Sequence, residues 1–353
     1  MNPASWKRLL LALWCIPLLT LSGCWDVKDI NKRYLPVVMG VDEGEKEAYR
    51  VILQIPTVRG GTQILEDEAK SISKAIDQIR TKAEKSIDLL HLRLFLISER
   101  LAKKGIGDVV DFAIRADDIS IKGMVGIVQG KFEKTLYHQV KPTPEVSSYD
   151  YFSEESGWTP SVTIDRLWEA YRSIHSYTED MPAPLIEAGT DTLFIFKGSA
   201  IMQGDKMIGM VSPDETMILN VFQEKYTGGT IEVAQDTSVL IKKAKVRHEK
   251  SWTAAGPRLK SSIALDIVVT ESKEDESNEE IARKIKQLIE MRAAEIVLKL
   301  HKLKSDTLST GQIFRPMLTE DQLKNWKTEW YPKLKHEISC QVRIRDSIYF
   351  KET

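Results

Sequence analysis

The sequence TSVLIKKAKVRHEKSWT at 237–253, followed by GPRLKSSIALDIVVTE at 256–271, sets the architecture of the C-terminal part of this chain. Apolar and polar residues alternate along both stretches, which is the period of a strand with one buried face. We predict strands at 231–234, 237–252 and 258–271. Long strands joined by short turns most simply pair in sequence, so the pattern indicates an antiparallel meander over 230–271.

The segment after this meander predicts the longest helix of the chain. An acidic, polar link at 272–278 leads into residues 278–302, where apolar side chains recur at steps of three and four and form one buried face. Acidic residues at its start suit the positive end of the helix dipole. We expect this helix to pack on the antiparallel sheet, followed by a short helix at 319–326 and a final strand at 337–350.

The N-terminal part alternates helices and strands, which is typical of an α/β or α+β layer. Strands at 34–42 and 48–55 read as a hairpin. Further elements are expected in the following order: a helix at 66–85, a strand at 89–97, a short helix from Ser98 to Gly105, a helix at 108–116, a strand at 120–129, a helix at 163–177, strands at 185–188, 192–202 and 207–211, and a helix capped by Ser212 with Pro213 and Glu215 in its first turn.

The change of pattern along the chain predicts two regions of a mixed α/β, α+β protein. We place an N-terminal α/β region at 24–195 and a C-terminal α+β region at 196–353. The pattern leaves one alternative open, in which the hairpin at 34–55 pairs with strands near 185–211 and makes the first domain discontinuous. The roughly 330 residues that follow the N-terminal segment are enough for two or three domains.

The first 23 residues have the layout of a lipoprotein signal peptide. Lys7 and Arg8 precede an apolar run at 9–21, which is shorter than the roughly 20 apolar residues that span a bilayer. The run ends in Leu-Ser-Gly-Cys at 21–24, a bacterial lipobox, so we predict removal of 1–23 and an N-acyl diacylglyceryl cysteine at Cys24. In the alternative, the signal is cleaved and Cys24 is incidental, which we disfavour because lipobox cysteines directly after such a run are rarely accidental.

The net charge and the cysteine content further limit the class of protein to which this chain can belong. The chain of 353 residues has a net charge of −1, and removal of Lys7 and Arg8 brings it to about −3. This balance argues against general nucleic-acid binding. Of three cysteines, Cys15 leaves with the signal and Cys24 carries lipid, so Cys340 stands alone and no disulfide framework is expected. Cys340 lies in an alternating apolar run and is expected to be a buried small hydrophobe.

The sequence contains no recognisable catalytic or cofactor motif. A nucleophile elbow, a P-loop, a dinucleotide-binding glycine motif and a zinc-protease motif are all missing. The six histidines show no metal-ligand spacing and are expected to be structural or surface residues: His91, His138, His175, His248, His301 and His336. We therefore predict no catalytic, cofactor-binding or metal site and no enzymatic activity.

A basic run and an aromatic cluster can each be interpreted in two ways. Lys242, Lys243, Lys245, Arg247 and Lys250 alternate with apolar residues, and we favour the solvated face of a strand over contact with anionic lipid headgroups.

The aromatic residues at 149, 151, 152 and 158 lie in a polar, loop-like region and form either a contact surface or a local lid. We leave these two possibilities open. Trp326, Trp330 and Tyr331 are expected in the core, because Trp326 and Trp330 stand four residues apart, as on one helix face.

Several stretches resemble the Ger(x)C family, the C subunits of spore germinant receptors. Cys24 is followed at once by Trp25 and Asp26, as at the start of family members. Further similar stretches occur in the same order: Val37 to Asp42, Tyr49 to Val51, His91, Leu96 to Glu99, Asp111-Phe112 with Arg115, Phe196 to Ala200, Gly204 to Lys206, Asp306 to Gly311, Trp326 and Trp330. The family often closes its last strand with a glycine, whereas Arg345, Asp346 and Ser347 stand in that region here.

The resemblance implies a lipoprotein of about three small mixed domains without catalysis. It implies anchoring through Cys24 by fatty acyl chains such as palmitate, on the outer face of the spore inner membrane. The implied partners are integral-membrane A-type and B-type receptor subunits, and the implied role is assembly of the receptor or signalling in nutrient-triggered germination.

Two other functions remain as alternatives. A substrate-binding lipoprotein that delivers a small ligand to a membrane transporter would need two similar lobes around a cleft, whereas the two regions predicted here are unlike. An envelope hydrolase is the weakest alternative, because no catalytic motif supports it.

Overall fold

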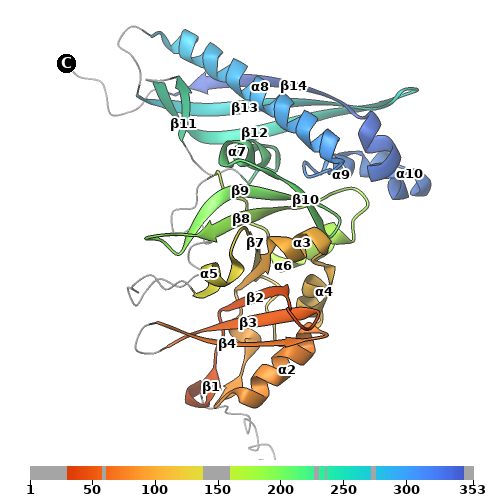
Figure 1. Ribbon diagram of the computed structural model, residues 1–353. Coiled ribbons are helices and arrows are strands. Elements are labelled where there is room, and N and C mark those ends of the chain that lie inside the picture. Colours follow the sequence, from red (N-terminus) through yellow and green to blue (C-terminus); the bar gives the residue numbers. More distant parts are fainter. Residues whose placement is uncertain are drawn as a thin grey trace, which may run out of the picture.

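The computed structural model describes residues 30–57, 61–137, 160–225, 230–234, 237–271 and 276–345. These residues form three sheets: a two-stranded sheet, an eight-stranded sheet in the order β10-β9-β8-β7-β6-β2-β3-β4, and a four-stranded sheet in the order β11-β12-β13-β14. Helices pack on the two larger sheets (Figure 1). The predicted mixed α+β class is therefore confirmed.

The eight-stranded sheet has a parallel centre and antiparallel edges. Strands β2, β6, β7 and β8 run parallel, and β3, β4, β9 and β10 add to them as antiparallel neighbours. Its strands are β2 (Val38–Glu43), β3 (Tyr49–Pro56), β4 (Thr62–Ala69), β6 (Leu94–Ser98), β7 (Met124–Val128), β8 (Pro182–Ala188), β9 (Phe194–Gln203) and β10 (Lys206–Val211).

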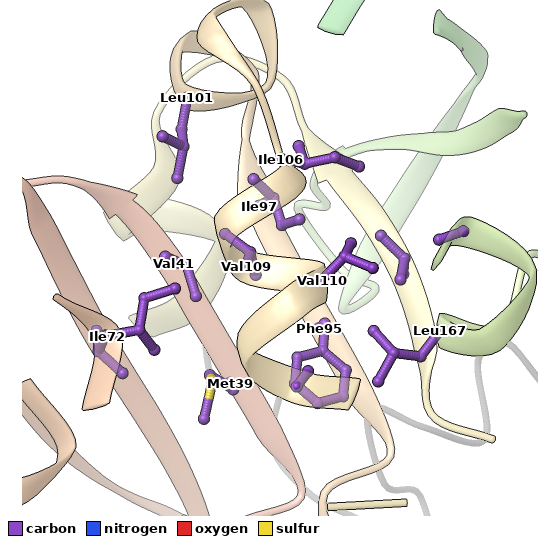
Figure 2. Packing of buried hydrophobic residues seen from close by; sticks show 14 of the residues in the cluster. Met39, Val41, Ile72, Phe95, Ile97, Leu101, Ile106, Val109, Val110 and Leu167 are labelled. Atoms are coloured by element: carbon purple, nitrogen blue, oxygen red, sulfur yellow. The ribbon is translucent and has the colours of Figure 1, made fainter. Parts of the chain in front are cut away.

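Helices cover both faces of this sheet, which explains why its central strands are almost entirely apolar. One face packs against α2 (Ile72–Lys82), α3 (Glu99–Lys104), α4 (Gly107–Arg115) and α6 (Leu167–Ile174). Figure 2 shows Phe95 and Ile97 of β6 directed towards Val109 and Val110 of α4. Leu94 and Leu96 point to the other face, where they pack with α5 (Phe132–Tyr137).

The C-terminal layer confirms the predicted meander and long helix. β11 (Thr230–Ala234), β12 (Thr237–Thr253) and β13 (Gly256–Glu271) pair antiparallel. Helix α8 (Asn278–Leu303) buries Ile281, Ile285 and Ile289 against this sheet. The final strand β14 (Lys335–Ile344) lies parallel to β13, because α8 first carries the chain back along the sheet.

Short elements complete the fold. The N-terminal end holds η1 (Ile30–Lys32), β1 (Arg33–Tyr34), β5 (Ser86–Ile87) and η2 (Leu89–His91), and β1 pairs parallel with β5. Helix α7 (Pro213–Phe222) lies between the two large sheets, and the segment after α8 contains α9 (Thr310–Phe314), η5 (Arg315–Met317), α10 (Glu320–Lys324), η6 (Trp326–Trp330) and η7 (Tyr331–Lys333).

The helix predicted at 66–85 was wrong at its start. Residues 62–69 form β4 at the edge of the sheet, and α2 begins only after Ser71, whose side chain caps it by accepting from the N–H of Lys74. Residues 66–69, predicted as the first turn of the helix, lie on this edge strand, where Glu66 pairs with Arg50 of β3 at 2.8 Å. Cross-strand pairing therefore outweighs the local helix pattern.

The strand predicted at 89–97 is also partly wrong. Its first residues form η2, capped by Asp88, and β6 begins at Leu94. By contrast, the helix starts predicted at Ser98, Ser212 and Thr319 are confirmed, since each side chain accepts a hydrogen bond from a backbone N–H in the first turn of its helix.

The hairpin of β2 and β3 and the strands β8 to β10 share one sheet, with β6 and β7 between them. They therefore do not pair directly. Strand β9 runs across the boundary placed between residues 195 and 196, and the division into domains stays a prediction.

Candidate functional site

A groove of about 890 Å³ lies where the eight-stranded sheet meets the C-terminal layer. Its walls come from α6, from the chain leading into β8, from the end of α7, from β12 and from the segment around α9. Its size falls in the range of small-molecule sites. Its side chains determine which chemistry it can support.

Acidic and basic side chains in the groove pair with one another. Lys225 Nζ lies 3.1 Å from Asp165 Oδ1 and 3.6 Å from Glu169 Oε1. Arg172 Nε lies 3.0 Å from Glu179 Oε1. Burial raises the pKa of Asp165, although Lys225 opposes this shift. These pairs tie α6 to the end of α7 and to the chain before β8, which is a structural role.

Beside the groove, two buried aspartates join the two layers. Asp180 Oδ2 accepts from the N–H of Asp306 at 2.9 Å, and its Oδ1 accepts from the N–H of Gly204 at 2.8 Å and from Lys327 Nζ at 2.7 Å. The N–H of Asp180 donates to the carbonyl of Asp306 at 3.1 Å. One carboxylate thus contacts the β9–β10 turn and two segments of the C-terminal layer.

Asp306 organises the segment after α8. Its carboxylate accepts from the N–H and hydroxyl of Thr310, from the N–H of Gly311 and from the indole of Trp326. Burial raises the pKa of Asp306 to about 6, while these hydrogen bonds act to lower it. Gly311 has no room for a side chain, because a Cβ would lie 2.4 Å from Trp326 Nε1.

Three neighbouring histidines, His248, His301 and His336, lie in the C-terminal layer, and His248 lines the groove. Ser261 Oγ lies 2.8 Å from His248 Nδ1 and 2.7 Å from His336 Nε2. Burial, together with the neighbouring His248 and His301, lowers the pKa of His336 to about 4. Within the described part of the chain, no three His, Cys, Asp or Glu side chains form a group able to hold a metal ion.

A further buried carboxylate, that of Asp42, lies near the end of β2. Asp42 accepts hydrogen bonds from Ser98 Oγ and from Arg100, whose Nε and Nη2 each lie 2.7 Å from it. Ser98 also caps α3. Asp42 therefore ties the end of β2 to the β6–α3 corner.

Several side chains singled out in the sequence are structural. Cys340 is 2% exposed, and burial raises the pKa of its thiol to about 12. Trp326 and Tyr331 are buried as predicted, and Trp330 packs against them while partly exposed.

In the basic run, Lys242, Lys243 and Lys245 are exposed and Val246 is buried, as expected for a solvated strand face. A bulge between Ile241 and Lys243 accounts for two successive exposed lysines.

The one predicted site residue, Cys24, lies outside the described residues, as do the aromatic residues at 149, 151, 152 and 158. None of the helices in the described ranges is long and apolar enough to cross a membrane. The junction formed by Asp180 and Asp306 was missed as a site, because it joins residues 126 apart. Only the resemblance drew attention to the stretch from Asp306 to Gly311.

Comparison with known proteins covers most of the chain. Residues 26–188 match the family model "Spore germination protein N-terminal domain". Residues 197–348 match "Spore germination B3/ GerAC like, C-terminal".

Full-length relatives and one solved structure agree with these matches. Spore germination protein B3 of Bacillus subtilis (strain 168) is 23% identical, over 95% of this chain and 94% of that protein. Spore germination protein GerQC of Bacillus cereus is 18% identical, over 93% and 95%. The crystal structure of the GerBC protein superposes with a TM-score of 0.59 at 16% identity, over 87% of this chain and 97% of that one, which establishes a similar fold.

Proposed function

Because this chain belongs to the GerAC-like family of spore germination proteins and is a GerC-type germinant receptor subunit, we propose that it is a lipid-anchored, non-catalytic subunit needed for assembly or signalling of the receptor. The observation that carries the proposal is the lipobox ending at Cys24, directly ahead of the family match that begins at residue 26. The anchor places the body on the outer face of the spore inner membrane, beside A-type and B-type integral subunits.

A scaffolding role agrees with the chemistry of the groove. Several of its charged groups pair with each other, as in Lys225–Asp165 and Arg172–Glu179. Asp306 is occupied by hydrogen bonds from its own segment. These contacts favour a rigid body that presents surfaces to partners over a reaction centre.

Tethering explains how such a body acts without a tight interface of its own. A protein held at the membrane reaches an effective concentration on the order of millimolar towards neighbours in the same bilayer. Contacts that are weak in solution are then sufficient for assembly.

Replacement of Cys24 by alanine tests the proposal. The Cys24→Ala chain should lack acyl groups, leave the membrane fraction of spores and reduce nutrient-triggered germination. Cys340→Ala is the matched control and should keep both membrane attachment and germination. A Cys24→Ala chain that stayed fully membrane-bound and active would refute the anchor.

The groove supports one weaker alternative, a substrate-binding lipoprotein that delivers a small ligand to a transporter. Its volume suits a small molecule, but the eight-stranded and four-stranded sheets on its two sides are not similar lobes. Calorimetry with amino acids and sugars distinguishes the two functions, because a stoichiometric heat signal at micromolar concentration would favour the alternative.

A further inference from the structure

The first described residue lies close in sequence to the proposed anchor. Five residues separate Cys24 from Ile30, where η1 begins. A chain extends at most about 3.5 Å per residue, so Ile30 stays within about 20 Å of the acylated cysteine. If Cys24 is anchored, as the proposed function requires, the part of the body around η1 must lie near the bilayer surface.

That part of the body is a compact structure, which we call the tether tip and define as residues 30–34 and 84–93. Strand β1 pairs with β5, and the N–H of Asp88 donates to the carbonyl of Tyr34 at 3.0 Å. Arg33 forms an ion pair with Asp88 inside the tip. Leu89 and Leu92 of the tip are buried in the core of the eight-stranded sheet, so the fold holds the tip in place and defines its outer surface.

The outer surface of the tether tip combines positive charge with one projecting apolar side chain. The tip holds four basic and two acidic residues, although the whole chain is slightly acidic. Lys32 and Lys85 are exposed, and Lys85 Nζ lies 5.5 Å from the centre of the Tyr34 ring. Leu90, at the middle of η2, is 57% exposed. Exposed lysines and an exposed apolar side chain on the same tip suit an anionic membrane interface.

The other basic surface of the protein lies elsewhere. The basic run on β12 belongs to the C-terminal layer, at the upper end of Figure 1, whereas β1 lies at the lower end. A body that stands on the tip therefore holds the basic run on β12 away from the bilayer surface.

We propose that the tether tip rests on the anionic headgroups of the bilayer that holds the Cys24 anchor, with Leu90 inserted between the headgroups and Lys32 and Lys85 beside them. This contact orients the body, so that α2 and β4 lie near the membrane and α8 points away from it. The contact at the tip thus gives the anchored body a defined orientation towards the membrane subunits.

Lysine footprinting on vesicles tests this orientation without depending on acylation in the cell. The chain from Cys24 to Thr353 is coupled through Cys24 to a maleimide lipid in vesicles of phosphatidylglycerol and phosphatidylcholine. Cys340 will not compete, because its thiol is buried. Acetylation of Lys32 and Lys85, followed by mass spectrometry, should slow about three-fold or more relative to the uncoupled chain, while Lys242 and Lys245 should react at unchanged rates.

Two variants distinguish membrane contact by the tip from attachment through the anchor. Leu90→Asp should return the labelling of Lys32 and Lys85 to the level of the uncoupled chain, whereas Met291→Asp, an equally exposed position on α8, should leave their protection intact. Equal labelling of all four lysines in coupled and uncoupled chains, or protection of Lys242 and Lys245 instead, would overturn the proposed orientation. Failure of the natural anchor would appear separately, as an unmodified Cys24 in the protein from spores.

Discussion

Asp180 and Asp306, 126 residues apart in the chain, bond to each other in both directions. The N–H of Asp306 donates to the Asp180 carboxylate at 2.9 Å, and the N–H of Asp180 donates to the carbonyl of Asp306 at 3.1 Å. Lys327 and the indole of Trp326 complete the arrangement from the same short segment. The junction of the two large layers thus rests on buried polar contacts as well as on apolar packing.

The substitution Asp306→Asn should destabilise the protein by about 3 kcal/mol, because hydrogen bonds to a buried carboxylate are strong. In addition, the amide NH2 group of asparagine would face N–H donors that now bond to a carboxylate oxygen. Urea denaturation at pH 7.5 measures this. Asp214→Asn is the control, since that side chain is 71% exposed, and it should change stability little. A loss no larger than the control's would contradict the assigned role of Asp306.

Lys327→Met should also cost about 3 kcal/mol, because it leaves the fully buried Asp180 carboxylate without its cation. Lys324→Met removes a lysine from the neighbouring turn, where the ion pair with Glu320 is exposed, and should cost less than about 0.5 kcal/mol. Thermal unfolding of both variants checks the difference. Equal melting temperatures would show that Lys327 does not compensate Asp180.

His336 should make the protein less stable in acid. The folded state keeps this ring neutral down to about pH 4, whereas the unfolded chain takes up the proton near pH 6.5. Stability from this group is therefore complete above pH 6.5 and is lost as pH falls towards 4. Asp306 acts in the opposite sense, because its folded pKa of about 6 lies above its ordinary value of 3.8 and its contribution is lost as pH rises.

A His336→Gln variant isolates the histidine from the aspartate. Between pH 7 and pH 4.5, the wild type should lose about 2 kcal/mol more stability than the variant, while the contribution of Asp306 stays common to both. Urea titrations at the two pH values measure this difference. Parallel pH profiles would show that His336 titrates normally in the folded state.

Gly40→Ala should destabilise the protein by about 1–2 kcal/mol, because a Cβ at this position would lie 2.2 Å from Leu136 Cδ1 of α5. The double variant Gly40→Ala/Leu136→Ala tests this cause directly. Its loss of stability should be smaller than the sum of the two single losses, because the second change makes room for the first. Additive losses would point to backbone effects at residue 40 instead.

Local signals in the sequence predict much of the fold. Ser98, Ser212 and Thr319 mark helix starts because a capping side chain acts within three residues of its partner. The meander and α8 follow from periods of two and of three to four residues. Burial of Cys340 and Trp326 follows from the same patterns.

Long-range pairing accounts for what the sequence could not show. Residues 66–69 belong by local pattern to the helix predicted at 66–85, but they lie in β4 because β3 offers an edge along its whole length. The parallel placement of β14 depends on where α8 ends relative to β13. Asp180 and Asp306 act as a junction only after two distant segments meet, and no local spacing encodes that meeting.

The shared core between the layers has a mechanical consequence. Ile201 of β9 and Val211 of β10 are buried in the same cluster as α7, α8 and the four-stranded sheet. A hinge between the layers would have to expose that apolar surface to water and would be costly. The described body should therefore move as one rigid unit, so that a displacement of α8 also tilts β1 and α2.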